Sequence, residues 1–128
     1  MKQILVLLSL ALLTSCYSNQ RDCTDFKTGT FEFTYTIDGT EHTSRFKRTD
    51  TLNIDYHEGH ADSSSVRWIN DCEFILKKLH PTTNTEKEAI HMKILSTTKD
   101  SYVFEYKRAV KRPNRPTRVE KGVAKKVD

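Results

Sequence analysis

Three cysteines are the residues of this chain with the widest choice of chemistry: Cys16, Cys23 and Cys72. A thiol can be acylated, can be oxidised to a disulfide, or can bind a metal ion as the thiolate. Zinc sites and dithiol redox centres typically use a Cys-x-x-Cys spacing, which the sequence lacks. The sequence therefore favours acylation or a disulfide for these thiols, and the residues around each cysteine indicate which.

Cys16 follows a segment with the composition of an export signal. The segment carries Lys2 near its start, and its apolar stretch at residues 4–13 is too short for a transmembrane helix, which needs about 20 apolar residues. We therefore predict a signal peptide over residues 1–15. The junction Leu13-Thr14-Ser15-Cys16 resembles the lipobox of bacterial lipoproteins. This resemblance implies that Cys16 carries diacylglycerol and acyl chains such as palmitate, which would anchor the protein to a membrane; the alternative is an ordinary secretory signal.

Acylation of Cys16 would leave Cys23 and Cys72 as the two remaining thiols. An exported domain meets an oxidising compartment in most Gram-negative envelopes, so we predict that these two cysteines form a disulfide. The bond would close a loop of about 50 residues, which the chain-entropy model values at roughly 4 kcal/mol. A reactive thiol or a pair of metal ligands is the alternative interpretation.

The predicted cleavage after residue 15 leaves 113 of the 128 residues, which is enough for one domain with a modest core. Residues 16–22 are expected to form a polar tether, and residues 23–128 a single β domain. All Phe, Tyr and Trp residues of the chain follow the signal peptide. We therefore expect a core that relies on aromatic side chains.

Alternation of apolar and polar residues predicts a series of β-strands after Cys23. Residues 31–37 alternate strictly, and Asp38-Gly39 follows them as a strong hairpin signal, because both central residues of a type I′ turn need positive φ. Further strands are predicted at residues 41–48, 52–56, 66–69, 72–79, 90–94, 102–106 and 117–126.

Some of these predicted elements differ in how deeply we expect them to be buried. The 41–48 strand has Phe46 as its only strongly apolar residue, so we expect it to be poorly buried. Residues 62–65 are expected to be a polar connection, and the last strand to run through Val119 and Val123. Trp68 is expected to pack in the core beside the disulfide.

Seven to eight short strands with frequent turn signals and no convincing helix predict an all-β fold. The favoured architecture is an antiparallel meander, which forms either a curved open sheet or a small lipocalin-like barrel. Closure would remove exposed strand edges. The sequence leaves open whether the last strand meets the first.

The C-terminal segment is strongly basic. Residues 107–126 contain nine Lys or Arg residues and one acid, Glu120, while Pro113 and Pro116 keep part of the segment extended. Its candidate anion-binding residues are Arg108, Lys111, Arg112, Arg115 and Arg118. We expect them to face an anionic component of the cell envelope, or else to form a solvated loop. Nucleic acid is a weaker candidate because no interleaved aromatic residues offer a base-stacking platform.

Other polar motifs do not form a catalytic pattern. His57-Glu58-Gly59-His60 lacks the His-Glu-x-x-His spacing of a zincin helix, and its glycine indicates a hairpin tip. Ser63-Ser64-Ser65 lacks the Gly-x-Ser-x-Gly sequence of a nucleophile elbow. We therefore predict no enzymatic activity, no cofactor and no metal site.

Several longer stretches carry a resemblance to a known family. They are Phe26-Lys27-Thr28-Gly29-Thr30-Phe31, Arg48-Thr49-Asp50-Thr51-Leu52-Asn53-Ile54-Asp55-Tyr56, Ser65-Val66-Arg67-Trp68-Ile69-Asn70-Asp71-Cys72-Glu73-Phe74-Ile75-Leu76 and Ile94-Leu95-Ser96-Thr97-Thr98-Lys99-Asp100-Ser101-Tyr102. Together they resemble short Bacteroidetes lipoproteins of unknown function, many of which carry the inherited name DNA topoisomerase IV. The resemblance spans most of the mature chain and implies a lipid-anchored envelope protein.

These observations predict a non-catalytic binding or structural module of the cell envelope. Because Tyr17 rather than an aspartate follows Cys16, we expect the anchor in the outer membrane, with the domain facing the periplasm. A lipocalin-like carrier of a small apolar ligand is the first alternative. An activity related to the inherited topoisomerase name is the second.

Mass spectrometry of the mature protein would test the cysteine assignments together. We expect a lipid-modified N-terminal Cys16 and, without reduction, a peptide pair joining Cys23 to Cys72. After reduction, the pair should separate while the lipid stays on Cys16. A free thiol at Cys16 would contradict the anchoring prediction.

Overall fold

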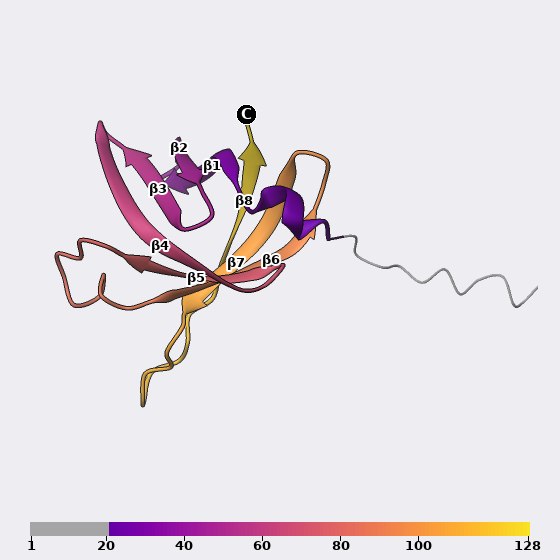
Figure 1. The fold of residues 1–128 in the computed structure, drawn as a ribbon. Coiled ribbons are helices and arrows are strands. Elements are labelled where there is room, and N and C mark those ends of the chain that lie inside the picture. The colour runs from indigo at the N-terminus through magenta and orange to yellow at the C-terminus, as the bar shows by residue number, and fades with distance from the viewer. Residues whose placement is uncertain (1–20) are drawn as a thin grey trace, which may run out of the picture.

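The computed structural model describes residues 21–128, so the signal peptide, Cys16 and most of the tether lie outside the described residues. A short 3₁₀ helix, η2 (Cys23–Phe26), precedes eight strands (Figure 1). The strands are β1 (Gly29–Ile37), β2 (Thr40–Arg48), β3 (Leu52–His57), β4 (His60–Asn70), β5 (Glu73–Lys78), β6 (Ile90–Thr97), β7 (Ser101–Arg108) and β8 (Glu120–Lys126). Within residues 21–128, no helix has the length and apolar character needed to span a membrane.

The eight strands form a closed antiparallel meander barrel, which confirms the all-β prediction and resolves the choice between open sheet and barrel. Each strand pairs with its neighbours in the sequence, and β8 pairs with β1 to close the barrel. The closing seam is short: it joins Phe31 to Lys126, Glu32 to Lys125 and Phe33 to Ala124. Closure gives β1 and β8 a partner on both sides, so neither remains a free edge.

Two hairpins turn at acidic residue–glycine pairs. Asp38 and Gly39 have φ of 50° and 77°, and Glu58 and Gly59 have φ of 49° and 78°. Positive φ at both positions is the requirement of the tight hairpin turn, so the turn predicted at Asp38-Gly39 is confirmed. His57 ends β3 and pairs in register with His60 at the start of β4.

Successive strands alternate in direction, so their connections divide between two ends of the barrel. We call one end the mouth: it carries the β1–β2, β3–β4, β5–β6 and β7–β8 connections. The opposite end, the floor, is covered by η2 (Figure 1). There a disulfide joins Cys23 of η2 to Cys72 in the β4–β5 turn, with the Cα atoms 5.2 Å apart. The predicted cysteine pairing therefore fixes the floor to the barrel wall.

Aromatic side chains fill the floor half of the barrel. Phe26 of η2 is 1% exposed, and its ring centroid lies 5.3 Å from that of Tyr102. Phe31 stacks on Phe46 at 5.1 Å, and Trp68 packs against this core together with Cys72, as expected. Such ring pairs contribute about 0.5–1.5 kcal/mol each beyond the area they bury.

A buried arginine lies at the centre of this aromatic cluster. Arg48 is 2% exposed, and its guanidinium carbon lies 4.7–5.8 Å from five ring centroids. Its Nε donates to the carbonyl oxygen of Lys27 at 3.2 Å, and its Nη2 donates to the carbonyl oxygen of Phe26 at 2.7 Å and to Tyr102 Oη at 3.1 Å. The cation therefore links the end of η2 to β7.

Two expectations from the sequence are wrong. β2 buries Ser44, Phe46 and Arg48 on alternate positions, so it is not a poorly buried strand. Residues 62–65 belong to β4, and their polar character hid the strand because the inward position holds the buried Ser64 rather than an apolar residue. The predicted last strand at residues 117–126 corresponds to β8, which begins at Glu120; it contains Val123, which is 53% exposed, whereas Val119 precedes it.

The inward positions of β8 are small because a ring occupies the space beside them. Gly122 and Ala124 pair with Phe104 and Tyr102, and a Cβ at Gly122 would lie 2.7 Å from Phe104 Cζ. The space that a larger inward side chain at Gly122 would fill is therefore occupied by the Phe104 ring of β7. This packing explains why the valines of the segment point away from the core.

Replacing Arg48 by methionine tests the role of the buried guanidinium. Arg48→Met should lower the free energy of unfolding by about 2–4 kcal/mol, because the buried carbonyl oxygens of Phe26 and Lys27 lose their donor. Arg45→Met on the same strand is the matched control: Arg45 is exposed and pairs with Glu32 at 2.5 Å, so its loss should cost less than about 1 kcal/mol. Equal costs in urea denaturation would contradict this role.

Candidate functional site

The mouth half of the barrel contains a cavity of about 230 Å³. Strands β1, β2, β5, β6 and β7 supply its apolar wall, which consists of Phe33, Phe46, Leu76, Ile90, Met92, Phe104 and Tyr106. These side chains lie on the inward positions of their strands, as their register shows: Leu76 pairs with Ile90, and Met92 with Tyr106. The aromatic filling of the floor therefore gives way to a hollow toward the mouth.

One wall of the cavity is polar. Asn53 and Asp55 of β3 line it, and Asn53 Nδ2 donates to Asp55 Oδ2 at 3.2 Å. Burial raises the pKa of the Asp55 carboxyl above its usual value of 3.8, and the neighbouring Asp62 raises it further against the opposing effects of Asn53, Lys78 and Arg48. The cavity therefore combines an apolar wall with a carboxyl group that is poorly solvated.

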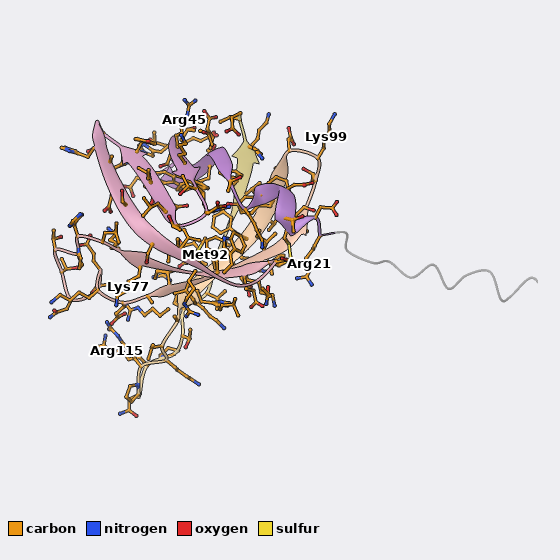
Figure 2. The ribbon with its side chains drawn as sticks, in the orientation of Figure 1. Arg21, Arg45, Lys77, Met92, Lys99 and Arg115 are labelled. Carbon is orange, nitrogen blue, oxygen red and sulfur yellow. A yellow bond between two sulfur atoms is a disulfide. The ribbon has the colours of Figure 1, made fainter. Side chains whose placement is uncertain are left out.

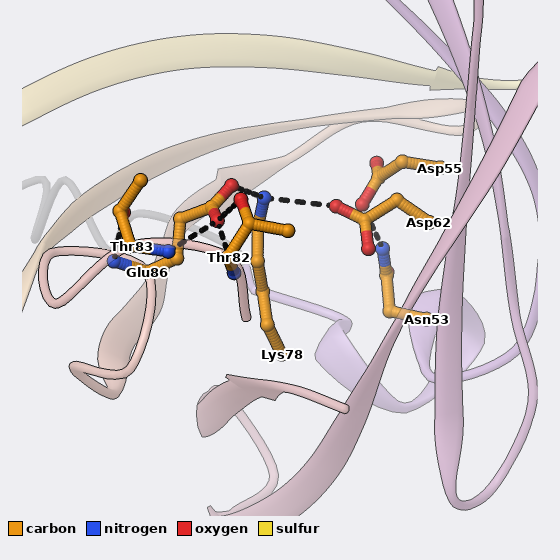
Figure 3. A network of polar contacts seen from close by, with 7 residues as sticks. All are labelled: Asn53, Asp55, Asp62, Lys78, Thr82, Thr83 and Glu86. Atoms are coloured by element: carbon orange, nitrogen blue, oxygen red, sulfur yellow. Dashed lines mark hydrogen bonds and ion pairs between the residues drawn. The ribbon is translucent and has the colours of Figure 1, made fainter. Parts of the chain in front are cut away.

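Lys78 connects this polar wall to the β5–β6 loop (Figure 3). Its Nζ lies 2.8 Å from Asp62 Oδ2 and 2.8 Å from Glu86 Oε1, and hydrogen bonds to these two carboxylates raise the pKa of Lys78. Glu86 also accepts bonds from the backbone N–H of Thr82 and of Thr83. The pKa of Glu86 is lowered to about 2, and the hydrogen bond from Lys78 is the largest cause. A charged carboxylate therefore ties the loop to the barrel.

A second hollow of about 310 Å³ lies beneath the β7–β8 loop. We call it the basic cleft. Its cationic lining consists of Lys107, Arg108, Arg112, Arg115 and Arg118, and its acidic lining includes Glu120. Ile90 and Tyr106 line both the basic cleft and the barrel cavity, so the two hollows meet at these side chains.

The structure divides the five predicted anion-binding residues into two groups. Arg108 Nε lies 3.0 Å from Glu88 Oε2, and Arg112 pairs with Glu88 Oε1. Arg118 Nε lies 2.5 Å from Glu120 Oε1. Lys111 and Arg115 are exposed, and Arg115 lies on the β7–β8 loop that extends away from the barrel (Figure 2).

Glu88 joins the two large loops of the mouth. It belongs to the β5–β6 connection, whereas Arg108 ends β7 and Arg112 lies in the loop that follows. The hydrogen bond from Arg112 is the largest cause that lowers the pKa of Glu88, and both arginines lower it further by their charge. The basic segment is therefore partly neutralised, and its arginines are held over the barrel mouth.

Asn53 and Asp55, which line the cavity, and their neighbour Asp62 were not among the site residues predicted from the sequence. Their signal was present but ambiguous, because polar residues on alternate positions of β3 and β4 look like an outward strand face. Among the described residues, no group of three or more His, Cys, Asp or Glu side chains is placed to hold a metal ion. His57 and His60 lie at the exposed β3–β4 hairpin.

The fold and the hollow together define the class of the molecule: an antiparallel meander barrel with a filled floor and a cavity at its mouth. Comparison with family models, with curated proteins and with solved structures finds no match to the chain. We therefore infer the function from the barrel's own residues.

Asp55→Asn tests the electrostatic cost of the polar wall. Because the folded-state pKa of Asp55 is raised, its contribution to stability is fully present below pH 3.8 and is lost as the pH rises through the raised pKa. At pH 7 the neutral variant should therefore melt a few degrees above the wild type, and the difference should vanish at pH 3. The matched control is Asp100→Asn at an exposed carboxylate, which should show no such pH-dependent gain. A variant less stable than the wild type at pH 7 would refute the prediction.

Proposed function

We propose that this protein is a lipid-anchored, non-catalytic binding module of the cell envelope, and that its barrel holds a small, largely apolar ligand. The observation that carries the proposal is the cavity of about 230 Å³ at the barrel mouth. Small-molecule sites are typically concave, mostly apolar and supplied with a few polar groups that fix orientation. The apolar wall with Asn53 and Asp55 beside it has this composition.

The contrast between the two halves of the barrel supports binding over a purely structural role. Phe26, Phe31 and Tyr102 fill the floor half, and each is at most 1% exposed. In the mouth half, Leu76, Met92 and Ile90 are only partly buried although they face inward. Covering such partly exposed apolar side chains with an apolar ligand is favourable, because each Å² of apolar surface buried lowers the free energy by about 25 cal/mol.

The cellular setting of the proposal comes from the sequence. The Leu13-Thr14-Ser15-Cys16 junction supports an acylated N-terminus, and Tyr17 after the cysteine supports retention at the periplasmic face of the outer membrane. The disulfide between Cys23 and Cys72 fits an oxidising compartment. A lipid-anchored barrel would hold its ligand close to a membrane without entering the bilayer.

Filling the cavity tests this function. The neutral dye N-phenyl-1-naphthylamine becomes fluorescent in apolar surroundings, so the mature domain should bind it with a saturable increase in fluorescence. Leu76→Trp should weaken binding by about tenfold or more, which corresponds to about 1.4 kcal/mol, because the larger ring occupies the cavity.

Val123→Trp is the matched control, since Val123 is 53% exposed on the outer side of β8. This variant should bind the dye as the wild type does. Both variants should melt cooperatively by circular dichroism, which separates loss of the cavity from loss of the fold. Equal dye binding by Leu76→Trp and the wild type would sink the proposed function.

A further inference from the structure

We propose that the ligand is a short amphiphile with an anionic head, and that its head binds the arginines of the basic cleft while its apolar part occupies the barrel cavity. This inference rests on the proposed function and extends it by naming the class of ligand. It joins two hollows that the sequence did not connect. The shared chemistry is a carboxylate or phosphate on one end of an apolar body.

The barrel cavity and the basic cleft are adjacent. Ile90 and Tyr106 line both hollows, so a molecule whose apolar part lies in the cavity places its other end next to the cleft. The register places Ile90 of β6 opposite Arg108 of β7. One inward position of the barrel is thus apolar, and the paired position carries a guanidinium at the mouth.

The two hollows differ in charge. The basic cleft has five cationic side chains in its lining and one acid, Glu120. The cavity has one of each sign, Arg48 and Asp55, and Arg48 is occupied by the carbonyl oxygens of the floor. The raised pKa of Asp55 reflects burial, so a second anion in the cavity would be disfavoured. Charge therefore orients an amphiphile with its anionic head outward.

Two arginines of the basic cleft already bind a carboxylate, that of Glu88. Arg112 donates through Nε and Nη2 to Glu88 Oε1, and Arg108 Nε lies 3.0 Å from Oε2. Oε2 is buried and accepts no hydrogen bond from the described residues despite this ion pair. The two guanidinium groups thus already surround a carboxylate, with one of its oxygens imperfectly bonded. We infer that the ligand's head takes over these arginines from Glu88.

The size of the cavity limits the apolar part. A volume of about 230 Å³ lies below the roughly 300–1,000 Å³ of typical small-molecule pockets. This small size favours a short acyl chain over a long one. Octanoate is therefore a suitable probe, and 1-octanol is its uncharged counterpart with the same chain.

Displacement of bound N-phenyl-1-naphthylamine by these two probes tests the inference. Octanoate should displace the dye from the wild type at a concentration about tenfold lower than 1-octanol, since charge-assisted hydrogen bonds are the strong ones. The double variant Arg112→Gln, Arg115→Gln should lose this preference while it still releases the dye to 1-octanol. Arg45→Gln, at an exposed arginine on the outer face of β2, should keep the preference.

Glu88→Gln provides an independent arm. Removing the internal carboxylate charge should strengthen octanoate binding by about threefold, which is less than one charge-assisted hydrogen bond contributes, and leave 1-octanol unchanged. Weaker octanoate binding by Glu88→Gln would contradict the inference that the ligand's head replaces Glu88 as the partner of the arginines.

The remaining outcomes separate the sources of the anion. Equal displacement by octanoate and 1-octanol would overturn the anionic head while leaving the proposed function intact. If inorganic phosphate blocks octanoate binding at concentrations as low as those at which octanoate itself binds, the cleft binds a free anion. This result would overturn the inference that the ligand is an amphiphile. If the double variant keeps its octanoate preference but loses retention on phosphatidylglycerol vesicles, the arginines face a membrane and the inference is wrong. Absence of dye binding to the wild type would reject the proposed function itself.

Discussion

The hydrogen bonds of Arg48 to the carbonyl oxygens of Phe26 and Lys27 are the interaction on which the rest of the barrel depends. A buried guanidinium is costly unless its N–H groups are bonded, and here the end of η2 supplies the acceptors. The same cation lies against five aromatic rings. Helix, rings and cation therefore stabilise one another, and the disulfide from Cys23 keeps η2 in place.

This concentration of packing at the floor leaves a hollow in the mouth half. A small barrel filled evenly from end to end has no space for a ligand, whereas this one gathers its most deeply buried rings around Arg48 in the floor half. The mouth is instead organised by charged contacts between loops, in which Lys78 holds Glu86 and two arginines hold Glu88. Ion pairs between half-exposed side chains of this kind are weak, so they can exchange partners without unfolding the barrel.

The sequence predicted the elements better than their burial. The alternation of apolar and polar residues located most strands. The turn at Asp38-Gly39 and the disulfide between Cys23 and Cys72 were also predicted correctly. The burial of Arg48 was not predictable, because its acceptors are backbone atoms 21 and 22 residues away. Residues 62–65 were misread because a polar inward wall has the same alternation as an outward one. The partners of Arg108 and Arg112 depend on how two loops meet, which no local pattern encodes.

The position of η2 also sets the direction in which the barrel faces. The described chain begins on the floor side, and the basic loop between β7 and β8 lies at the opposite end (Figure 1). Under the proposed acylation of Cys16, the six Cα–Cα steps from it to Asp22 could span at most about 20 Å. The anchored barrel would thus stand on its floor, with its opening turned toward the aqueous compartment. A ligand would then be exchanged with soluble partners across that space rather than with the supporting bilayer.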